Sequence, residues 1–436
     1  MMEYRERLSL LMKLRDVIKG YENEIYDALY QDLMKSKFES YESEIGLILA
    51  ELNYNIKYLS SWMKFKTVPT PMSHMPASSL VYREPYGRVL IISPWNYPFQ
   101  LTLIPLIHAW AAGNQVTIKP SELSTASEKV IYKMLTENFH TSRVRVMTGG
   151  PEVTMDLLEK KFDFIFFTGS TRVGKIVMQK AAAHMTPVSL QLGGKSPCIV
   201  DNSCNLRMAA KRIVRGKFLN SGQSATAPEF VLIDETKKDA FLKYVDEYIH
   251  KFYGEEPLKS PDYGKIINHT HFYRLMDLIE HQEILLGGDF NLQTLQIEPT
   301  VVAENSLASE MMKTEIFGPI LPVITYKTWE EAVDKIMRFH HSPALYLFTK
   351  NKEHEEFVKN ECITGSICIN DTMLQVTTPY LPFGGVGSSG MGKYHGKAGF
   401  DTFSNIKSVM KRSNGGSRIM FPPFKDKLPI LKRILK

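Results

Sequence analysis

Cysteine is scarce in this sequence. Four cysteines occur in 436 residues, at positions Cys198, Cys204, Cys362 and Cys368. None forms a C-x-x-C pair, and four thiols in so long a chain do not provide a disulfide framework. We therefore expect a reducing, cytoplasmic setting in which the thiols pack as small buried hydrophobic groups.

Long apolar runs are also missing. No stretch of about 18 uncharged apolar residues occurs, which argues against a membrane-spanning helix. The N-terminal segment Met1-Met2-Glu3-Tyr4-Arg5 is charged and lacks the apolar core of a signal peptide. Hydrophobic residues make up 44% and charged residues 23%, as in ordinary globular proteins, and the length predicts two or three domains.

An excess of basic residues is absent from most of the chain. The formal net charge is +6, but residues 405–436 carry nine Lys and Arg against one acid, Asp426. The remainder is slightly acidic, which argues against a nucleic-acid-binding body. The basic, amphipathic tail 425–436 indicates either a solvated end or peripheral contact with an anionic membrane.

The order of apolar segments predicts an α/β protein. Residues 3–63 read as helices, and a proline-rich connector at 67–72 and a hairpin around 78–84 are expected to follow. Short β-branched runs then alternate with helical segments, which is typical of a parallel sheet that binds ligands at the carboxyl ends of its strands. The strands are expected at 88–93, 116–119, 143–147 and 163–168. A second alternating series extends from about 188 to 380.

Two glycine-rich segments imitate nucleotide-binding motifs. Residues 169–176 nearly match a P-loop, but Ile176 stands where Ser or Thr should hold magnesium, so an NTPase is disfavoured. The strand–loop–helix geometry there still suits a phosphate, and a dinucleotide fits it better than a nucleoside triphosphate with magnesium. Residues 385–390 match G-x-G-x-x-G without a preceding strand, so these glycines are expected to allow tight turns beside a site.

Several segments together resemble the aldehyde dehydrogenase superfamily in order and spacing along nearly the whole chain. They are Pro94-Trp95-Asn96-Tyr97-Pro98, Lys119-Pro120-Ser121-Glu122, Phe167-Thr168-Gly169-Ser170, residues 190–197 and 220–228, Glu315-Ile316-Phe317-Gly318-Pro319 and Pro382-Phe383-Gly384-Gly385. Residues 261–268 and Pro422-Pro423 resemble the class 3, or fatty aldehyde dehydrogenase, branch. The resemblance implies NAD(P)-dependent oxidation of aldehydes to carboxylic acids, with medium-chain, long-chain or aromatic aldehydes favoured, and a homodimer.

The resemblance also implies a domain plan. A Rossmann-like parallel-sheet domain for NAD(P) is expected at 1–64 and 85–190, and a second α/β domain for catalysis at 191–380. A small bridging and oligomerisation element is expected at 65–84 and 396–424, followed by the basic tail 425–436.

Two positions depart from the family's catalytic pattern. In this family a cysteine thiolate attacks the carbonyl carbon, and a carboxylate then activates the water that hydrolyses the thioester. The resemblance places the nucleophile position at Ala225 and the general-base position at Gln191. A methyl group has no lone pair and an amide accepts no proton at neutral pH, so we expect the chain as written to be inactive. The amide of Asn96 and the backbone N–H of residue 225 are expected to form the oxyanion hole.

Three explanations of these departures stay open. The chain is an engineered inactive form, a natural pseudoenzyme that binds aldehyde or nucleotide without turnover, or an enzyme with another nucleophile, Ser224 or Thr226. Ala and Gln are minimal replacements for Cys and Glu, which favours the first.

The resemblance further assigns contacts to NAD or NADP. Lys119 and Glu122 are expected at the adenosine ribose, and Glu315 at the nicotinamide ribose with Phe317 packed beside it. The remaining expected cofactor contacts are Trp95, Gly169, Ser170, Val173 and Leu192.

No metal site is expected. The pairs His269/His271 and His340/His341 lack a third ligand at metal spacing. Lys195 and Lys393 lie near glycine loops and are expected to pair with backbone carbonyls or carboxylates rather than to act as nucleophiles.

Overall fold

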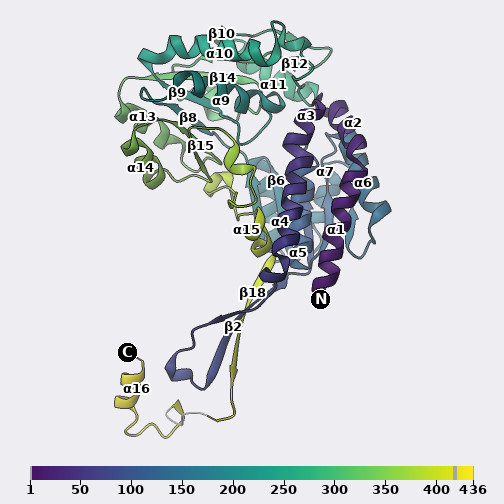
Figure 1. Cartoon of the computed structure of the whole chain (residues 1–436), viewed down its shortest axis with the longest axis vertical. Helices are drawn as coiled ribbons and strands as arrows, with labels where there is room; N and C mark the ends of the chain where they lie inside the picture. The colour runs from purple at the N-terminus through teal and green to yellow at the C-terminus, as the bar shows by residue number, and fades with distance from the viewer. Residues whose placement is uncertain (1, 416–419, 436) are drawn as a thin grey trace.

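The computed structural model describes residues 2–415 and 420–435, which form two α/β lobes and a long antiparallel arm (Figure 1). The first lobe contains the N-terminal helices and a six-stranded sheet, and the second contains a seven-stranded sheet. The predicted α/β class with parallel sheets is confirmed.

The sheet of the first lobe has the strand order β17-β7-β6-β3-β4-β5. Five of its strands run parallel, and they are β3 (Arg88–Ile92), β4 (Gln115–Lys119), β5 (Val144–Val146), β6 (Phe164–Gly169) and β7 (Val188–Leu192). The short β17 (Gly390–Met391) lies antiparallel to β7 at the edge. The four strands predicted between residues 88 and 168 are therefore present, each within one residue of its expected bounds.

Helices cover both faces of this sheet. One face packs against α1 (Tyr4–Gly20), α4 (Gly46–Trp62), α5 (Gln100–Ala112) and α6 (Thr125–Asn138), and the other against α7 (Pro151–Leu158) and α8 (Thr171–Ala182). Leu90 and Ile91 are neighbours in β3 but belong to opposite hydrophobic clusters, because successive side chains of a strand point to opposite faces. Burial on both sides explains why the central strands β3 and β6 are nearly continuous apolar runs.

The sheet of the second lobe has the order β10-β13-β14-β9-β8-β15-β16, and only β10 is antiparallel to its neighbour among these strands. The strands are β8 (Pro197–Val200), β9 (Phe230–Asp234), β10 (Glu283–Leu286), β13 (Thr300–Ala303), β14 (Ile320–Tyr326), β15 (Leu345–Phe348) and β16 (Ile367–Ile369). The larger helices of this lobe are α9 (Leu206–Phe218), α10 (Lys238–Tyr253), α11 (His269–Ile279), α13 (Trp329–Ile336) and α14 (Lys352–Glu361). Residues of α9 and α10 share one core with the sheet, and residues of α13 and α14 share another.

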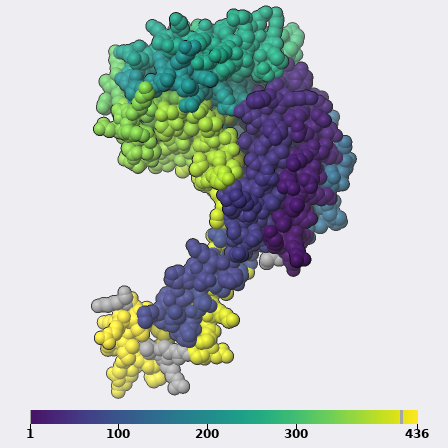
Figure 2. Space-filling view, in the orientation of Figure 1, coloured from purple at the N-terminus to yellow at the C-terminus, as the bar shows by residue number. Residues whose placement is uncertain are grey.

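The arm is a three-stranded antiparallel sheet of β1 (Lys66–Val68), β2 (Ala77–Pro85) and β18 (Ser404–Arg412). Strand β2 pairs with β18 over nine residue pairs, and Figure 2 shows the arm standing clear of the lobes. The predicted hairpin around 78–84 is wrong, because this segment is the middle of one straight strand. Its two partners lie at 66–68 and 404–412, and the second is too distant in sequence for a local pattern to reveal.

The remaining α-helices and strands lie between the elements given above or follow them. They are α2 (Glu22–Leu33), α3 (Lys37–Ser40), β11 (Phe290–Asn291), β12 (Gln296–Ile297), α12 (Glu310–Lys313), α15 (Gly396–Thr402) and α16 (Leu428–Ile434). Helix α15 packs against α4 and α5 of the first lobe, so the projecting part of segment 396–424 begins only with β18. Within residues 2–415 and 420–435, no helix has both the length and the apolar character needed to cross a membrane.

Candidate active site

A cavity of about 680 Å³ is lined by residues of both lobes. Nine of the predicted site residues line it, and they are Trp95, Asn96, Gly169, Ser170, Gln191, Leu192, Ala225, Glu315 and Phe317. The first lobe supplies one wall because parallel strands bring their carboxyl ends to one edge of a sheet. Asn96 follows β3, Gly169 ends β6, and Gln191 lies near the end of β7.

Asn96 is held from several sides. Its side-chain Nδ2 donates to the carbonyl oxygen of Gln223 at 3.0 Å, and its own carbonyl accepts from Lys35 Nζ at 3.0 Å and Asn220 Nδ2 at 2.9 Å. The side chain is buried and lines the cavity, and one of its two amide hydrogens is left for a ligand. The contact with residue 223 places this donor beside residue 225. The backbone N–H of Ala225 has no acceptor among the described residues.

A buried ion pair supports the loop that carries Asn96. Lys35 Nζ lies 2.9 Å from Glu44 Oε1, and both side chains are fully buried. The other carboxylate oxygen of Glu44 accepts from the backbone N–H groups of Phe99 and Gln100, at 3.0 and 2.8 Å, where α5 begins. Burial raises the pKa of Glu44, although Lys35 and these N–H groups oppose the rise. The pair therefore holds the middle of the loop after β3, at Asn96, and its end at the start of α5.

The nucleophile position holds a methyl group in the cavity wall. Ala225 lies between Ser224 and Thr226, whose hydroxyl groups are 3.2 Å apart and buried. Neither hydroxyl has a hydrogen bond to a histidine or a carboxylate among the described residues. Since a serine or threonine nucleophile needs an adjacent base, the geometry gives no support to this alternative.

The general-base position holds a buried amide. Gln191 Nε2 makes long contacts to Ser189 Oγ at 3.3 Å and to the Gly392 carbonyl at 3.4 Å. Its Oε1 is buried and has no partner within the described part of the chain, although the residue lines the cavity. A buried acceptor of this kind is costly unless a water or a ligand donates to it.

Glu315 is a partly buried acid in the second lobe's wall of the cavity. Its Oε1 accepts from the backbone N–H of Gly194 at 3.3 Å. Burial raises the pKa of Glu315 to about 8, and the neighbouring Glu229 adds to the rise. A Cβ atom at Gly193 would lie 2.1 Å from Glu315 Oε2, so the carboxyl group would have to move if any other residue stood there.

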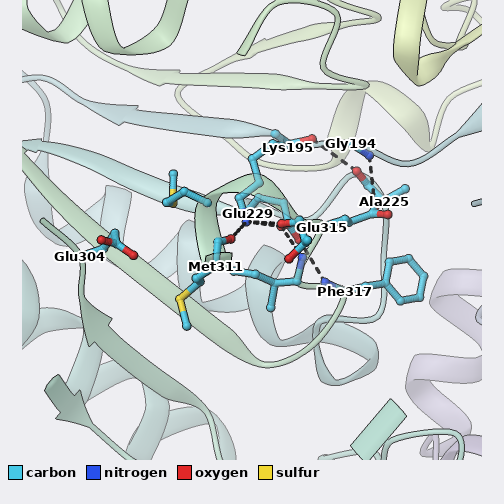
Figure 3. Close-up of polar contacts among 12 residues, drawn as sticks. Gly194, Lys195, Ala225, Glu229, Glu304, Met311, Glu315 and Phe317 are labelled. Carbon is cyan, nitrogen blue, oxygen red and sulfur yellow. Dashed lines mark hydrogen bonds and ion pairs between the residues drawn. The ribbon is translucent and has the colours of Figure 1, made fainter. Parts of the chain in front are cut away.

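Glu229 lies beside Glu315 and Lys195 (Figure 3), and Lys217 is a second lysine close to it. Burial would raise the pKa of Glu229, but Lys195 and Lys217 outweigh it and keep the pKa below its usual value. Lys195 Nζ lies 3.0 Å from Glu229 Oε2 and also donates to the carbonyls of Met311 and Thr314, at 2.6 and 2.9 Å. The prediction that Lys195 pairs with carbonyls and carboxylates is confirmed, and Lys393 donates to the carbonyls of Gly365 and Gly384 in the same way.

Three predicted cofactor residues lie outside the cavity lining. Lys119, at the end of β4, is buried, and its Nζ donates to the Pro120 carbonyl at 2.6 Å and to Glu122 Oε2 at 3.1 Å. Val173 packs into the apolar cluster beneath α8. These residues remain at the carboxyl edge of the sheet, beside the cavity rather than in it.

Sequence reasoning missed several cavity residues on α11. His271 and Arg274 line the cavity, and the ring centroid of His271 lies 5.2 Å from that of Trp95. Arg274 donates to the carbonyl of Ile316 at 2.7 Å. The available signal was Asn268, whose side chain caps the helix by accepting from the backbone N–H of His271. Among the described residues no group of three or more His, Cys, Asp or Glu is arranged to hold a metal ion.

Comparisons with known proteins agree with this site. Residues 1–409 match the model of the aldehyde dehydrogenase family. This chain belongs to the aldehyde dehydrogenase family. It is 44% identical over 433 residues to the 4,4'-diaponeurosporen-aldehyde dehydrogenase of Staphylococcus aureus (strain NCTC 8325 / PS 47), covering 99% of this chain and 94% of that one. It is 42% identical over 402 residues to aldehyde dehydrogenase family 3 member B1 of Homo sapiens, covering 92% and 86%.

Solved structures of aldehyde dehydrogenases have the same fold. The substrate-bound state of Staphylococcus aureus AldH superimposes with a TM-score of 0.98 at 43% identity, covering 100% of this chain and 95% of that one. An indole-3-acetaldehyde dehydrogenase in complex with NAD⁺ superimposes with a TM-score of 0.85 at 26% identity, covering 94% and 84%. The predicted membership of this family is confirmed, and family 3 members are among the relatives of this aldehyde dehydrogenase.

Proposed function

We propose that this chain binds NAD or NADP together with an aldehyde in a dehydrogenase-type site but does not oxidise the aldehyde. The observation that supports the proposal is that Ala225 and Gln191, which the family resemblance assigns to the nucleophile and base positions, both line the cavity. The surrounding groups, Asn96 and Glu315 among them, are retained and well supported.

The residues at the carboxyl edge of the first lobe's sheet fit a dinucleotide. Gly193 leaves room beside Glu315 that a Cβ atom would fill, and the buried Thr168 Oγ1 has no partner within the described residues. The 12-residue helix α8 begins directly after Ser170, so its N-terminus faces the same edge. Lys119 and Glu122 would hold the adenosine side, and Glu315 with Phe317 the nicotinamide side. NAD(P) supplies a hydride acceptor when it is bound.

The groups of this chain would bind and polarise an aldehyde without converting it. Asn96 Nδ2 and the backbone N–H of Ala225 would donate to the carbonyl oxygen, as in an oxyanion hole. No lone pair is presented at residue 225, so the carbonyl carbon stays trigonal and hydride departure is not promoted. Gln191 cannot take a proton from water, so hydrolysis of an acyl group would also lack its base.

Restoring the two family residues tests the proposal. We expect Ala225→Cys with Gln191→Glu to produce NAD(P)H from a panel of medium-chain, long-chain and aromatic aldehydes, whereas the parent chain produces none. Ala225→Cys alone is the matched control, and it should give about one NAD(P)H per site and then stop, because no carboxylate activates the hydrolytic water.

Two results would contradict the proposal. One is turnover by the parent chain, with an acyl group on Ser224 or Thr226 found by mass spectrometry. The other is a double variant that binds NAD(P) but stays silent with every aldehyde, which favours a natural binding protein.

The apolar side of the cavity supports the substrate class. Leu47, Leu101, Leu219, Met373 and Val376 line it, which suits medium-chain, long-chain or aromatic aldehydes. We further propose that residues 1–64 and 85–190 bind the cofactor, that residues 191–380 form the catalytic domain, and that residues 65–84 and 396–424 bridge subunits.

The arm is the proposed surface for a homodimer. Phe65, Tyr82, Ile406 and Met410 are exposed on it, although such groups are usually covered. Sedimentation of Ile406→Glu with Met410→Glu should give a smaller species than the parent chain, and an unchanged mass would exclude this surface.

Peripheral membrane contact of a cytoplasmic protein is proposed for the tail. Leu428, Ile430 and Leu435 are exposed beside Lys432 and Arg433 on or next to α16. The full chain should float with anionic vesicles, whereas a chain truncated after Phe424 should not. Equal flotation of the two proteins would contradict the proposal.

A further inference from the structure

The substitutions that remove the catalytic groups also remove negative charge from the cavity. The family pattern places an ionisable thiol at position 225 and a carboxylate at position 191, whereas this chain has a methyl group and a neutral amide. Burial and the neighbouring Glu229 raise the pKa of the nearby Glu315, which favours its neutral form. Neither position 191 nor position 225, both in the cavity wall, therefore contributes a negative charge.

The other charged side chains of the cavity lining leave one cation without a carboxylate partner among the described residues. The rest are paired or exposed to solvent. Arg274 lines the cavity and bonds only to backbone carbonyls in the described structure, while Arg215 pairs with Glu42. The other acids of the lining are Asp277 and Glu310, whose side chains are exposed, so water screens them.

The same wall presents two donors that need an acceptor. One hydrogen of Asn96 Nδ2 bonds to the Gln223 carbonyl and the other remains free, and the backbone N–H of Ala225 has no partner among the described residues. An aldehyde oxygen carries only partial charge. A carboxylate carries a full charge over two oxygens, and charge-assisted hydrogen bonds are roughly twice as strong as neutral ones.

We infer that this cavity is a binding site for carboxylates with apolar tails, with the head group at Asn96 and Ala225 and the tail along the leucine and methionine side. In a site with a thiolate and a glutamate, such an acid would be repelled as a product. Here both repulsions are absent, so the acid is retained. The inference rests on the proposed function, because it uses the same ligand cavity. It differs in the ligand, which is a carboxylate instead of an aldehyde.

Calorimetric titration of the full chain with octanoate and 1-octanol at pH 7 tests the inference. The two probes have the same tail and differ in head-group charge. Octanoate should bind about tenfold more tightly than 1-octanol or better. The isosteric variant Gln191→Glu, which returns one negative charge to the wall, should lower this affinity ratio about tenfold, because like charges in juxtaposition repel each other.

The matched control makes the same change elsewhere. Gln293→Glu adds the same charge at an exposed turn outside the cavity and should leave the ratio unchanged. Octanoate that binds no better than 1-octanol, or a ratio insensitive to Gln191→Glu, overturns the inference. If NAD(P) binding and turnover of the double revertant stand while octanoate fails, only this inference falls and the proposed function does not.

Discussion

The carboxyl group of Glu315 packs directly against the backbone at Gly193. A Cβ atom on Gly193 would come within 2.1 Å of Glu315 Oε2, and the next residue, Gly194, donates its N–H to Glu315 Oε1 at 3.3 Å. This contact joins the strand end of the first lobe to the acid of the second. The position of the acid therefore depends on the absence of a side chain.

Gly193→Ala should disturb this contact. The methyl group must displace the carboxyl end of the Glu315 side chain, which is flexible and lines the cavity, so the cost should lie at the low end of the about 1–3 kcal/mol typical of overpacking. We expect a lower free energy of unfolding in urea and weaker NAD(P) binding. Gly20→Ala is the control, because no atom lies within 4 Å of a Cβ atom there, and equal stability of the two variants would contradict the contact.

Lys35→Met should lower stability strongly. The variant leaves Glu44 buried without its cation, and breaking a buried pair by removing one partner costs about 3–5 kcal/mol. The loss should appear in urea unfolding, and weaker ligand binding should accompany it because Lys35 also holds the Asn96 carbonyl. Lys180→Met breaks the exposed pair with Glu159 and should change little. Comparable losses of unfolding free energy in both variants would show that the buried pair stabilises the fold no more than the exposed pair.

Glu315 should make the folded state less stable as pH rises. In the folded protein its proton is held up to about pH 8, whereas an unfolded glutamate loses it near 4.5. Between these values the folded state binds more protons, so stability is greatest at low pH and falls by at most about 1.4 kcal/mol per pH unit for this group. Glu39, with a pKa raised by burial to about 7, acts in the same direction.

Urea unfolding of the parent and of Glu315→Gln at pH 5.5, 6.5 and 7.5 measures this contribution. The variant carries no titrating group at 315, so its stability should depend less steeply on pH. Parallel pH dependences of the two proteins would mean that Glu315 is ionised in the folded state.

Local patterns in the sequence were sufficient for the buried strands. The strand at 88–92 is apolar throughout because helices cover both of its faces, and this burial leaves a signal in the residues themselves. The arm leaves no such signal, since no residue of β2 is fully buried and the strand pairs with one that begins 319 residues after Pro85. A pairing of that range is set by tertiary structure and not by neighbouring residues.

The candidate site was predictable where short motifs carry it. Asn96, Gln191, Ala225 and Glu315 belong to recognisable segments, and the structure brings them to one cavity. His271 and Arg274 belong to an ordinary amphipathic helix, so only the packing of α11 against the cavity reveals them. Lys35 is a similar case, because its burial beside Asn96 arises from the path of the N-terminal helices.

The pairing of β2 with β18 has a consequence for biosynthesis. A ribosome that adds roughly 5–20 residues per second needs about 16–64 s to reach Ser404 after it has made Pro85. For that interval one long strand edge of β2 is exposed to other nascent chains. A chain released before β18 is made should therefore aggregate through this unpaired edge. The yield of folded protein should depend on how soon residues 404–436 are synthesised.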